Sequence, residues 1–205
     1  MNTDTVPHHA RSPGRPRGFA MDLALDQAIL IFRSKGYTAA SISDLAQAMG
    51  LSAGSIYKAF SDKRTLFLAA FDRYTSLRNA DLADRLAAVA TGRERLRAVL
   101  RFYAESSHDI EGQRGCLVVG SAIGLDTFDP ALAEAVAGTL RGNENLLAAL
   151  IDQGKADGSI KPGVNSAAAA RMMLTILLGM RVVGKTGRSL DDMAELVALA
   201  LKILD

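Results

Sequence analysis

Hydrophobic side chains recur at helical spacing along most of this chain, and no stretch alternates apolar and polar residues as a half-buried strand would. Leu25, Ala28, Ile29 and Phe32 lie at i, i+3, i+4 and i+7, and the same period continues for more than twenty residues beyond Lys63. The pattern predicts an all-α fold of about nine helices. With 205 residues, of which 49% are hydrophobic, such helices can bury a core without disulfides.

The pattern also divides the chain into three parts. Residues 1–18 contain three prolines, two glycines and almost no large apolar side chain, which indicates a flexible arm. Residues 19–65 are expected to form one small domain, and residues 66–205 a second, larger one. The single cysteine excludes an internal disulfide and a multi-cysteine zinc site, which is typical of a protein of the reducing cytoplasm. No cofactor or metal site is predicted.

Short helices separated by tight turns are expected within 19–65. The first is predicted from Met21 to Lys35, and the second follows Ser41 and ends at Gly50. Ser52 is a candidate N-cap for a third helix over 53–60. Three short helices with a glycine turn before the third are typical of a helix-turn-helix module, whose last helix leaves its outer face free to enter a DNA major groove.

The run from Gly36 to Phe71 closely resembles the DNA-binding domain of the TetR family of transcriptional regulators. The matching segments are Gly36-Tyr37, 41–46 (SISDLA), 49–52 (MGLS), 54–60 (GSIYKAF) and Asp62-Lys63. The resemblance implies an N-terminal helix-turn-helix domain followed by a helical ligand-binding and dimerisation domain.

The resemblance, together with the small and basic residues of this region, supplies a set of candidate DNA contacts. Helix starts at Ser41 and Ser52 are implied to contact the DNA backbone, Ser55 and Lys58 to face the groove, and Tyr57 and Lys63 to hold phosphates. Ala53 stands where the family often has a larger or basic residue, so DNA shape is expected to carry part of the specificity. The complete candidate set in the domain is Ser41, Ser43, Ser52, Ala53, Gly54, Ser55, Tyr57, Lys58 and Lys63.

The arm adds positive charge directly before this module. Residues 1–65 hold eight Lys and Arg against five Asp and Glu. The segment 13–18 (PGRPRG) resembles an AT-hook, in which extended backbone lays arginines along a narrow minor groove, so Arg15 and Arg17 are further candidate DNA contacts. The alternative is a tail whose charge is incidental.

The last two predicted helices, 166–186 and 190–204, are expected to pair two subunits as a four-helix bundle. The first is apolar on nearly every side, and Gly179 would permit close approach of a partner. The predicted interface comprises Met172, Ile176, Gly179, Met180, Val183, Met193, Val197 and Leu201. The alternative is that both are interior helices of a monomer. Because Arg171 and Arg181 interrupt the apolar run, no membrane span is expected.

In the middle of the second domain, a loop through Gly112 is expected to lead into a helix over 116–126. A ligand pocket is expected among the middle helices. Its candidate residues, chosen by position, are Phe102, Tyr103, His108, Cys116, Val119, Ala122, Phe128, Leu146 and Met173. The Gly115-Cys116-Leu117 segment resembles one found in TetR regulators that sense electrophiles or oxidants through a cysteine. With Arg114 nearby, Cys116 could react as a thiolate; the alternative is a small buried hydrophobe.

Together these features predict a cytoplasmic homodimeric regulator, a repressor by family default, that binds a palindromic DNA operator and is released by a small-molecule or electrophile inducer. One alternative is an architectural DNA-binding protein with little sequence preference. The other is a helical-bundle enzyme with Cys116 as nucleophile and His108 as base, although no activating triad pattern accompanies them and no catalytic residue is assigned.

Overall fold

The computed structural model describes the backbone of residues 17–205 and the side chains of residues 21–205. This part of the chain forms α-helices and short 3-10 turns, with no strand, which confirms the all-α prediction. The helices are α1 (Arg17–Ala39), α2 (Ile42–Met49), α3 (Ala53–Phe60), α4 (Lys63–Ala87), α5 (Gly92–Glu105), α6 (Asp109–Arg114), α7 (Leu117–Ala122), α8 (Pro130–Ala156), α9 (Ser166–Val183) and α10 (Leu190–Leu201). The 3-10 turns are Leu125–Thr127, Gly184–Thr186 and Lys202–Leu204.

The boundaries of the first helices follow from local chemistry. Ser41 and Asp44 form a capping box at the start of α2, and Gly50 ends it with a left-handed φ of 64°. The Ser52 hydroxyl accepts the Ser55 amide at the start of α3. Gly36 has φ 75° and ψ 169°, a conformation restricted almost entirely to glycine, so regular helical geometry breaks where the sequence predicted a stop.

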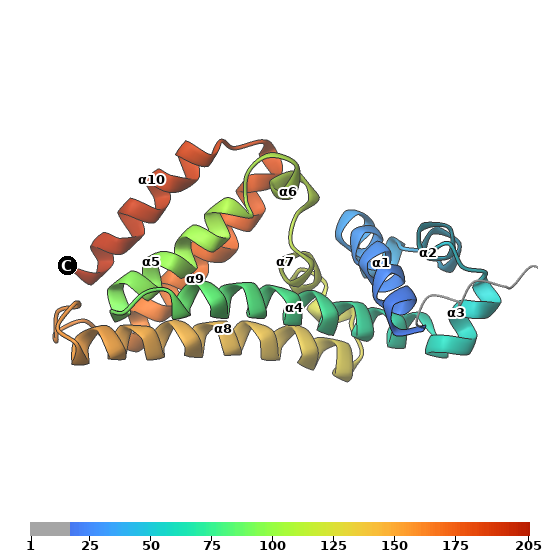
Figure 1. Ribbon diagram of the computed structural model, residues 1–205, viewed down its shortest axis with the longest axis horizontal. Helices are drawn as coiled ribbons and strands as arrows, with labels where there is room; N and C mark the ends of the chain where they lie inside the picture. The colour runs from blue at the N-terminus through green and yellow to red at the C-terminus, as the bar shows by residue number, and fades with distance from the viewer. Residues whose placement is uncertain (1–16) are drawn as a thin grey trace, which may run out of the picture.

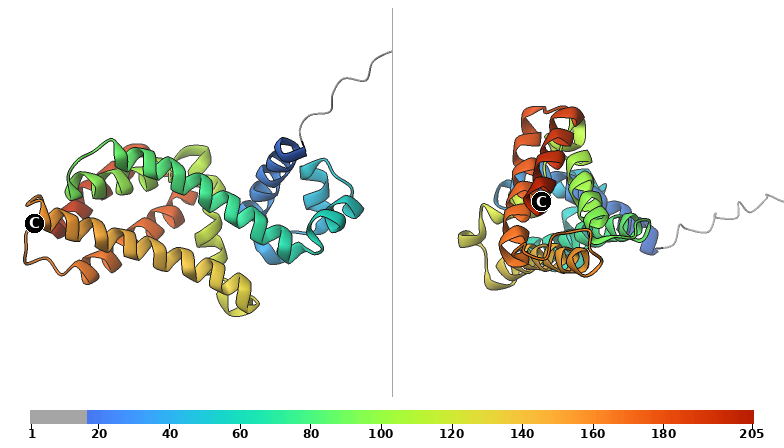
Figure 2. Two further views of the ribbon diagram at one scale, coloured as in Figure 1. Left: turned by 60° about the horizontal axis from the view of Figure 1, so that its bottom comes forward. Right: turned by 90° about the vertical axis from the view of Figure 1, so that its left-hand side faces the viewer.

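Helices α1, α2 and α3 gather at one end of the molecule (Figure 1). The long α4 leaves this end and runs beside the long α8, while α5, α9 and α10 complete the other end (Figures 1 and 2). One apolar core joins α1–α4 to α7 and the start of α8, around Phe32, Leu45, Ile56 and Phe67. A second core lies among α5, α8, α9 and α10.

The largest difference from the predicted elements lies between α5 and α7. The sequence indicated a loop through Gly112, but this segment forms the short helix α6. A Cβ at Gly112 would lie 2.7 Å from the backbone carbonyl of Ser107, so this glycine permits close packing. The helix predicted over 116–126 is divided into α7 and the turn Leu125–Thr127.

Helix α9 also differs from expectation in one respect. The segment 166–186 is long and apolar enough to cross a membrane by length and composition, with a mean hydropathy of 1.5 over an 18-residue window, so the two arginines do not interrupt the run as predicted. In the fold, however, Met173, Leu177 and Met180 lie in the second core, and Arg181 is buried as well. The core therefore accounts for one side of this helix, and 39% of the apolar window is buried in all.

Candidate DNA interface and sensing cavity

Helix α3 packs one side against the core and exposes the other side to solvent. Ile56 and Phe60 lie in the core, whereas Tyr57 is 51% exposed. The remaining exposed positions at and after its start are small or basic: Ser52, Ala53, Gly54, Ser55 and Lys58. Small side chains allow a backbone to approach a groove closely, and Lys58 supplies positive charge for phosphates. Six of the predicted DNA-contact positions therefore share one accessible surface, which lies at the tip of the molecule (Figure 1).

The serines at the helix starts form N-cap hydrogen bonds within the protein. The Ser52 hydroxyl accepts the Ser55 amide at 3.1 Å and lies 2.9 Å from the Ser55 hydroxyl. The Ser41 hydroxyl donates to the Asp44 carboxylate at 2.7 Å, and Ser43 is exposed beside it. Lone pairs not used in these caps remain open to solvent, so capping and DNA contact are compatible.

Lys63 has a structural role that the sequence did not predict. Its ammonium donates to the carbonyls of Thr38 and Ala40, at 3.3 and 3.1 Å, and lies 4.7 Å from the centre of the Tyr37 ring. Lys63 therefore ties the end of α1 to the start of α4. A phosphate contact by this side chain would compete with these bonds. Of the two arm candidates, Arg15 lies outside the described residues and Arg17 begins α1 with a side chain outside them.

The part of the chain that follows α3 contains a small cavity beside Cys116. Its wall includes Phe102, Tyr103, Cys116 and Val119, so four of the predicted pocket residues are brought together. The volume is about 20 Å³, room for about one water molecule. The cavity borders a wider groove of about 600 Å³ between α4 and α8, which is lined by the predicted Leu146.

The other predicted pocket residues lie elsewhere. Phe128 packs against Tyr37 and Phe67, with ring centres 5.5 and 6.2 Å apart, in the first core. Ala122 joins the same core, and Met173 is fully buried in the second. His108 contacts the Asp109 carboxylate at 2.8 Å, and it does not line the cavity with Cys116, so the structure does not form the nucleophile–base pair of the enzyme hypothesis.

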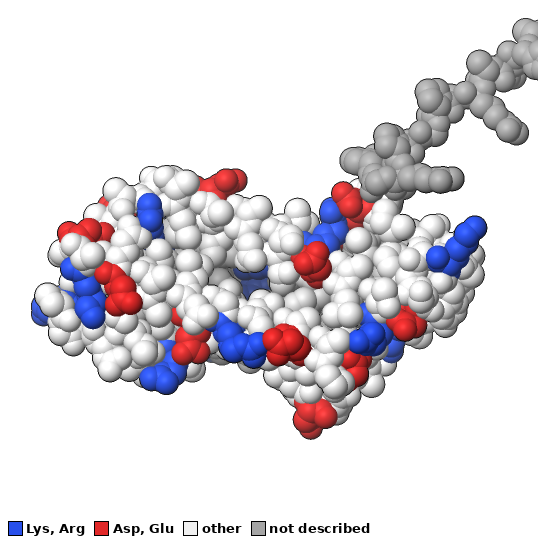
Figure 3. Space-filling view, turned by 90° about the horizontal axis from the view of Figure 1, so that it is seen from below, with Lys and Arg blue, Asp and Glu red and all other residues white. Residues whose placement is uncertain are grey.

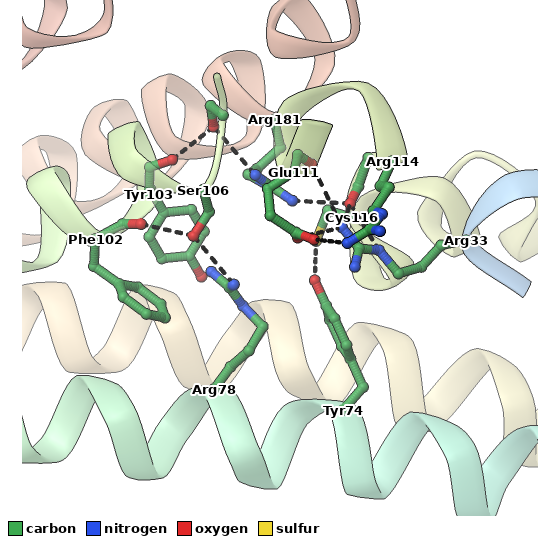
Figure 4. Close-up of polar contacts among 12 residues, drawn as sticks. Arg33, Tyr74, Arg78, Phe102, Tyr103, Ser106, Glu111, Arg114, Cys116 and Arg181 are labelled. Carbon is green, nitrogen blue, oxygen red and sulfur yellow. Dashed lines mark hydrogen bonds and ion pairs between the residues drawn. The ribbon is translucent and has the colours of Figure 1, made fainter. Parts of the chain in front are cut away.

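Polar and charged groups surround Cys116. The Tyr74 hydroxyl donates to its sulfur at 3.6 Å (Figure 4). Burial alone would raise the pKa of the Cys116 thiol, but the positive charge of Arg181, the Val119 amide and the Tyr74 hydroxyl together lower it. Burial and the neighbouring thiol raise the pKa of Tyr74 to about 12, so the phenol stays a proton donor.

Three arginines near this cysteine were missed as site residues. Arg33 of α1 donates to the Gly115 carbonyl from Nε at 3.0 Å and from Nη2 at 2.6 Å, and Arg181 of α9 donates to the same oxygen at 2.8 Å. Arg78 of α4 lines the cavity (Figure 4). A lone arginine carries no sequence signal for burial, which explains the omission. One carbonyl next to Cys116 thus joins α1 of the helix-turn-helix end to α9 of the sensing end.

The predicted dimer face needs revision. Met180, Met193, Val197 and Leu201 are at most 6% exposed within the protomer, because they pack into its own core, and they have little side-chain surface to offer a partner. Met172 and Val183 are 53% and 37% exposed, and Gly179 is exposed beside the half-buried Ile176. Further exposed apolar residues of this surface, not included in the prediction, are Val182, Leu196, Leu199 and Ile203.

Comparison with known protein families gives a match for the N-terminal part of the chain and another for the C-terminal part. Residues 24–70 match the family described as bacterial regulatory proteins, tetR family, and residues 92–198 match the tetracyclin repressor-like C-terminal domain. ComR, an HTH-type transcriptional repressor of Escherichia coli strain K12, is 27% identical, with 99% of this chain and 97% of ComR covered. YezE, described as an uncharacterized HTH-type transcriptional regulator of Bacillus subtilis strain 168, is 29% identical, with 94% of this chain and all of YezE covered.

Solved structures agree with these sequence matches. A cysteine mutant of the TetR family transcriptional regulator CifR, complexed with 26-base-pair double-strand operator DNA, has a TM-score of 0.82 and 29% identity, and the match covers 94% of this chain and 100% of CifR. The C-terminal family match alone spans more than half of the 205 residues. The chain therefore belongs to the TetR family of transcriptional regulators.

Proposed function

We propose that this TetR-family regulator binds a palindromic operator as a homodimer, with α3 of each protomer in a major groove. The observation that best supports this function is the composition of the solvent-exposed side of α3. Small residues and Lys58 are exposed there, whereas Ile56 and Phe60 on the other side are buried. A helix packed only for stability has no need of this combination. Two-fold symmetric dimers read two half-sites about one helical turn apart, about 34 Å.

The dimer is formed by the exposed apolar surface of α9 and α10. Met172, Val182 and Val183 lie on α9, and Leu199 on α10 is 57% exposed. Several large apolar side chains exposed on two helices are typical of a protein interface. Homodimerisation would fix the distance between the two α3 helices, on which operator recognition depends.

Selection of bound DNA from a random pool by the purified full-length protein tests this function. The proposal predicts a symmetric consensus with two half-sites. An architectural DNA-binding protein would instead enrich no consensus and would bind with an affinity set mainly by salt concentration. Enrichment of no sequence at moderate salt would contradict the proposal.

Release from the operator is assigned to a small molecule that binds next to Cys116. The cavity is lined by residues of α4, which begins beside α3, and by Cys116, which directly follows the Gly115 carbonyl that bonds Arg33 of α1. A ligand that moves either element would change the spacing of the two α3 helices and so favour the unbound state. In this role Cys116 lines the binding site and forms no covalent bond with the ligand.

A second candidate is covalent capture of an electrophile by Cys116. The lowered pKa of the thiol favours the thiolate, the form that attacks electrophiles. Replacing Cys116 by Ser tests it. If the variant binds operator and is still released by every electrophile that releases the wild type, covalent sensing is contradicted. The Tyr74→Phe variant provides a second readout, because loss of the donated hydrogen bond should slow thiol alkylation.

A further inference from the structure

Arg78 presents a half-buried guanidinium with one buried nitrogen and no negative partner among the described residues. Its Nη1 donates to the Ser106 hydroxyl at 3.2 Å, while Nη2 is inaccessible to solvent and makes no hydrogen bond within the described part of the chain. The guanidinium lies 4.3 Å from the centre of the Phe102 ring and 5.5 Å from that of Tyr103. Aromatic faces attract a cation but do not replace a lost hydrogen bond.

Acidic side chains on the neighbouring helices are engaged elsewhere. Glu134, which lines the adjoining groove, pairs with Arg141. Asp81 lies on α4 one turn beyond Arg78 and pairs with Arg85 at 2.9 Å. Glu105, at the end of α5, also pairs with Arg85. No ion pair to Arg78 occurs among the described residues. The charge therefore faces the cavity uncompensated.

Arg181 adds a second buried cation near the same cavity. It is 1% exposed, bonds only neutral groups, the Ser107 hydroxyl and the Gly115 carbonyl, and leaves its Nε without a partner in the described structure. A Cys116 thiolate would offset one positive charge but not two. Burying a charge without a partner of opposite sign costs free energy. An anion bound next to these two arginines would reduce that cost.

The adjoining groove defines the rest of such a ligand. The groove and the Arg78 cavity share Thr75, Asn79, Leu82, Thr139 and Asn143. The rest of the groove is lined mainly by small and apolar residues, among them Leu86 and Leu146, together with Glu134. Figure 3 shows the molecule from below, with positive side-chain atoms at the floor of a hollow and both acidic and basic side chains on the surface beside it. From Asn79 to Leu86 the groove follows α4 for about 10 Å, at 1.5 Å per residue.

From these contacts we infer that the natural effector is an amphiphilic organic carboxylate whose carboxylate pairs with Arg78 and whose apolar body lies in the α4–α8 groove. The inference rests on the proposed sensing function and names the chemical class of its ligand. The planar guanidinium suits a carboxylate because two N–H groups meet two oxygens. The cavity beside Arg78 has room for about one water, so only the head group enters it.

Calorimetric titration of the full-length protein with paired probes tests the inference. Octanoate is compared with 1-octanol, and 4-phenylbutyrate with 4-phenyl-1-butanol, so that each pair differs in the head group. We expect the better carboxylate to bind at least tenfold more tightly than its alcohol. We expect Arg78→Met to weaken its binding by about tenfold to hundredfold, the range of a lost charge-assisted hydrogen bond. Arg101→Met, at an exposed position on α5, serves as the matched control and should leave binding unchanged.

A second variant keeps the test valid if Arg78→Met folds poorly. Gly142 is a helical residue of the groove wall, and a Cβ there would meet no atom within 4 Å, so Gly142→Met fills the groove without a clash. It should fold normally and lose carboxylate binding. The inference is overturned if no carboxylate binds, if alcohols bind equally well, or if both variants bind as the wild type does.

Operator binding measured on the same preparations separates this inference from the function on which it rests. Sequence-specific DNA binding without carboxylate discrimination overturns only the ligand class. Loss of sequence-specific binding by the wild type overturns the proposed regulator.

Discussion

Replacing Arg33 by Met removes the bonds that join the helix-turn-helix end to the sensing end. The side chain donates twice to the Gly115 carbonyl and once to the Glu111 carboxylate at 2.9 Å, and it is only 7% exposed. A hydrogen bond involving a charged group contributes about 1.5–3 kcal/mol. Because Arg181 still donates to Gly115 and Glu111 is 47% exposed, no acceptor becomes buried without a partner.

The expected net loss is therefore about 2 kcal/mol, near the contribution of one such bond. For a chain of this length that loss lowers Tm by about 4–8 °C. Thermal unfolding followed by circular dichroism measures it. Arg114→Met is the matched control, because Arg114 is 49% exposed and bonds the same Glu111 at 2.7 Å. A surface pair of this kind contributes at most about 1 kcal/mol. Equal Tm values for Arg33→Met and the wild type would refute the reasoning.

Three further predictions concern packing, pH and assembly. Gly92→Ala should destabilise the fold by about 3 kcal/mol, because the new Cβ would lie 2.5 Å from the Leu150 carbonyl oxygen; chemical denaturation measures this. The bond from Lys35 and the capping box lower the pKa of Asp44 to about 2 from 3.8, so its contribution to stability is present above pH 4 and is lost toward pH 2. Asp44→Asn should therefore reduce the fall in Tm between pH 4 and pH 2. Leu199→Asp should convert the dimer to monomer in light scattering, without loss of helix content, because this side chain is exposed in the protomer.

Each of these predictions has a clear contrary result. Gly142→Ala, at a helical position with open space, should be neutral or stabilising, and a similar loss in both glycine variants would remove the packing argument. Parallel pH curves for Asp44→Asn and the wild type would contradict the assigned pKa. Ile123→Asp alters a side chain that is 81% exposed outside α9 and α10, so a dimer lost in this variant as well would argue against the assigned face.

The helix-turn-helix end was predictable because its signals are local. Caps at Ser41 and Ser52 and the turn glycine at Gly50 act within a few residues, and the structure has the helix starts and stops where these residues predict them. Gly112 shows the limit of local signals. It was interpreted as part of a loop, whereas its role is close contact with the Ser107 backbone, which depends on the tertiary fold.

The partner-facing side of the last helices was less predictable for a physical reason. An apolar helix indicates burial but not the element that buries it, so Met193 and Val197 were assigned to a partner although the protomer's own core contains them. The arginines were missed for the opposite reason. Arg181 was considered only as an interruption of an apolar run, and nothing in the sequence shows that Arg33 and Arg181 bond one carbonyl oxygen.

The central claim is sequence-specific recognition of DNA by a dimer through α3. Fluorescence anisotropy with the selected operator, and with the same duplex carrying one scrambled half-site, tests it most directly at fixed salt concentration. The account predicts two protomers per operator and an affinity for the intact site about a thousandfold or more above that for unrelated DNA, with an intermediate value for the half-scrambled duplex. Equal affinity for all three duplexes would contradict it.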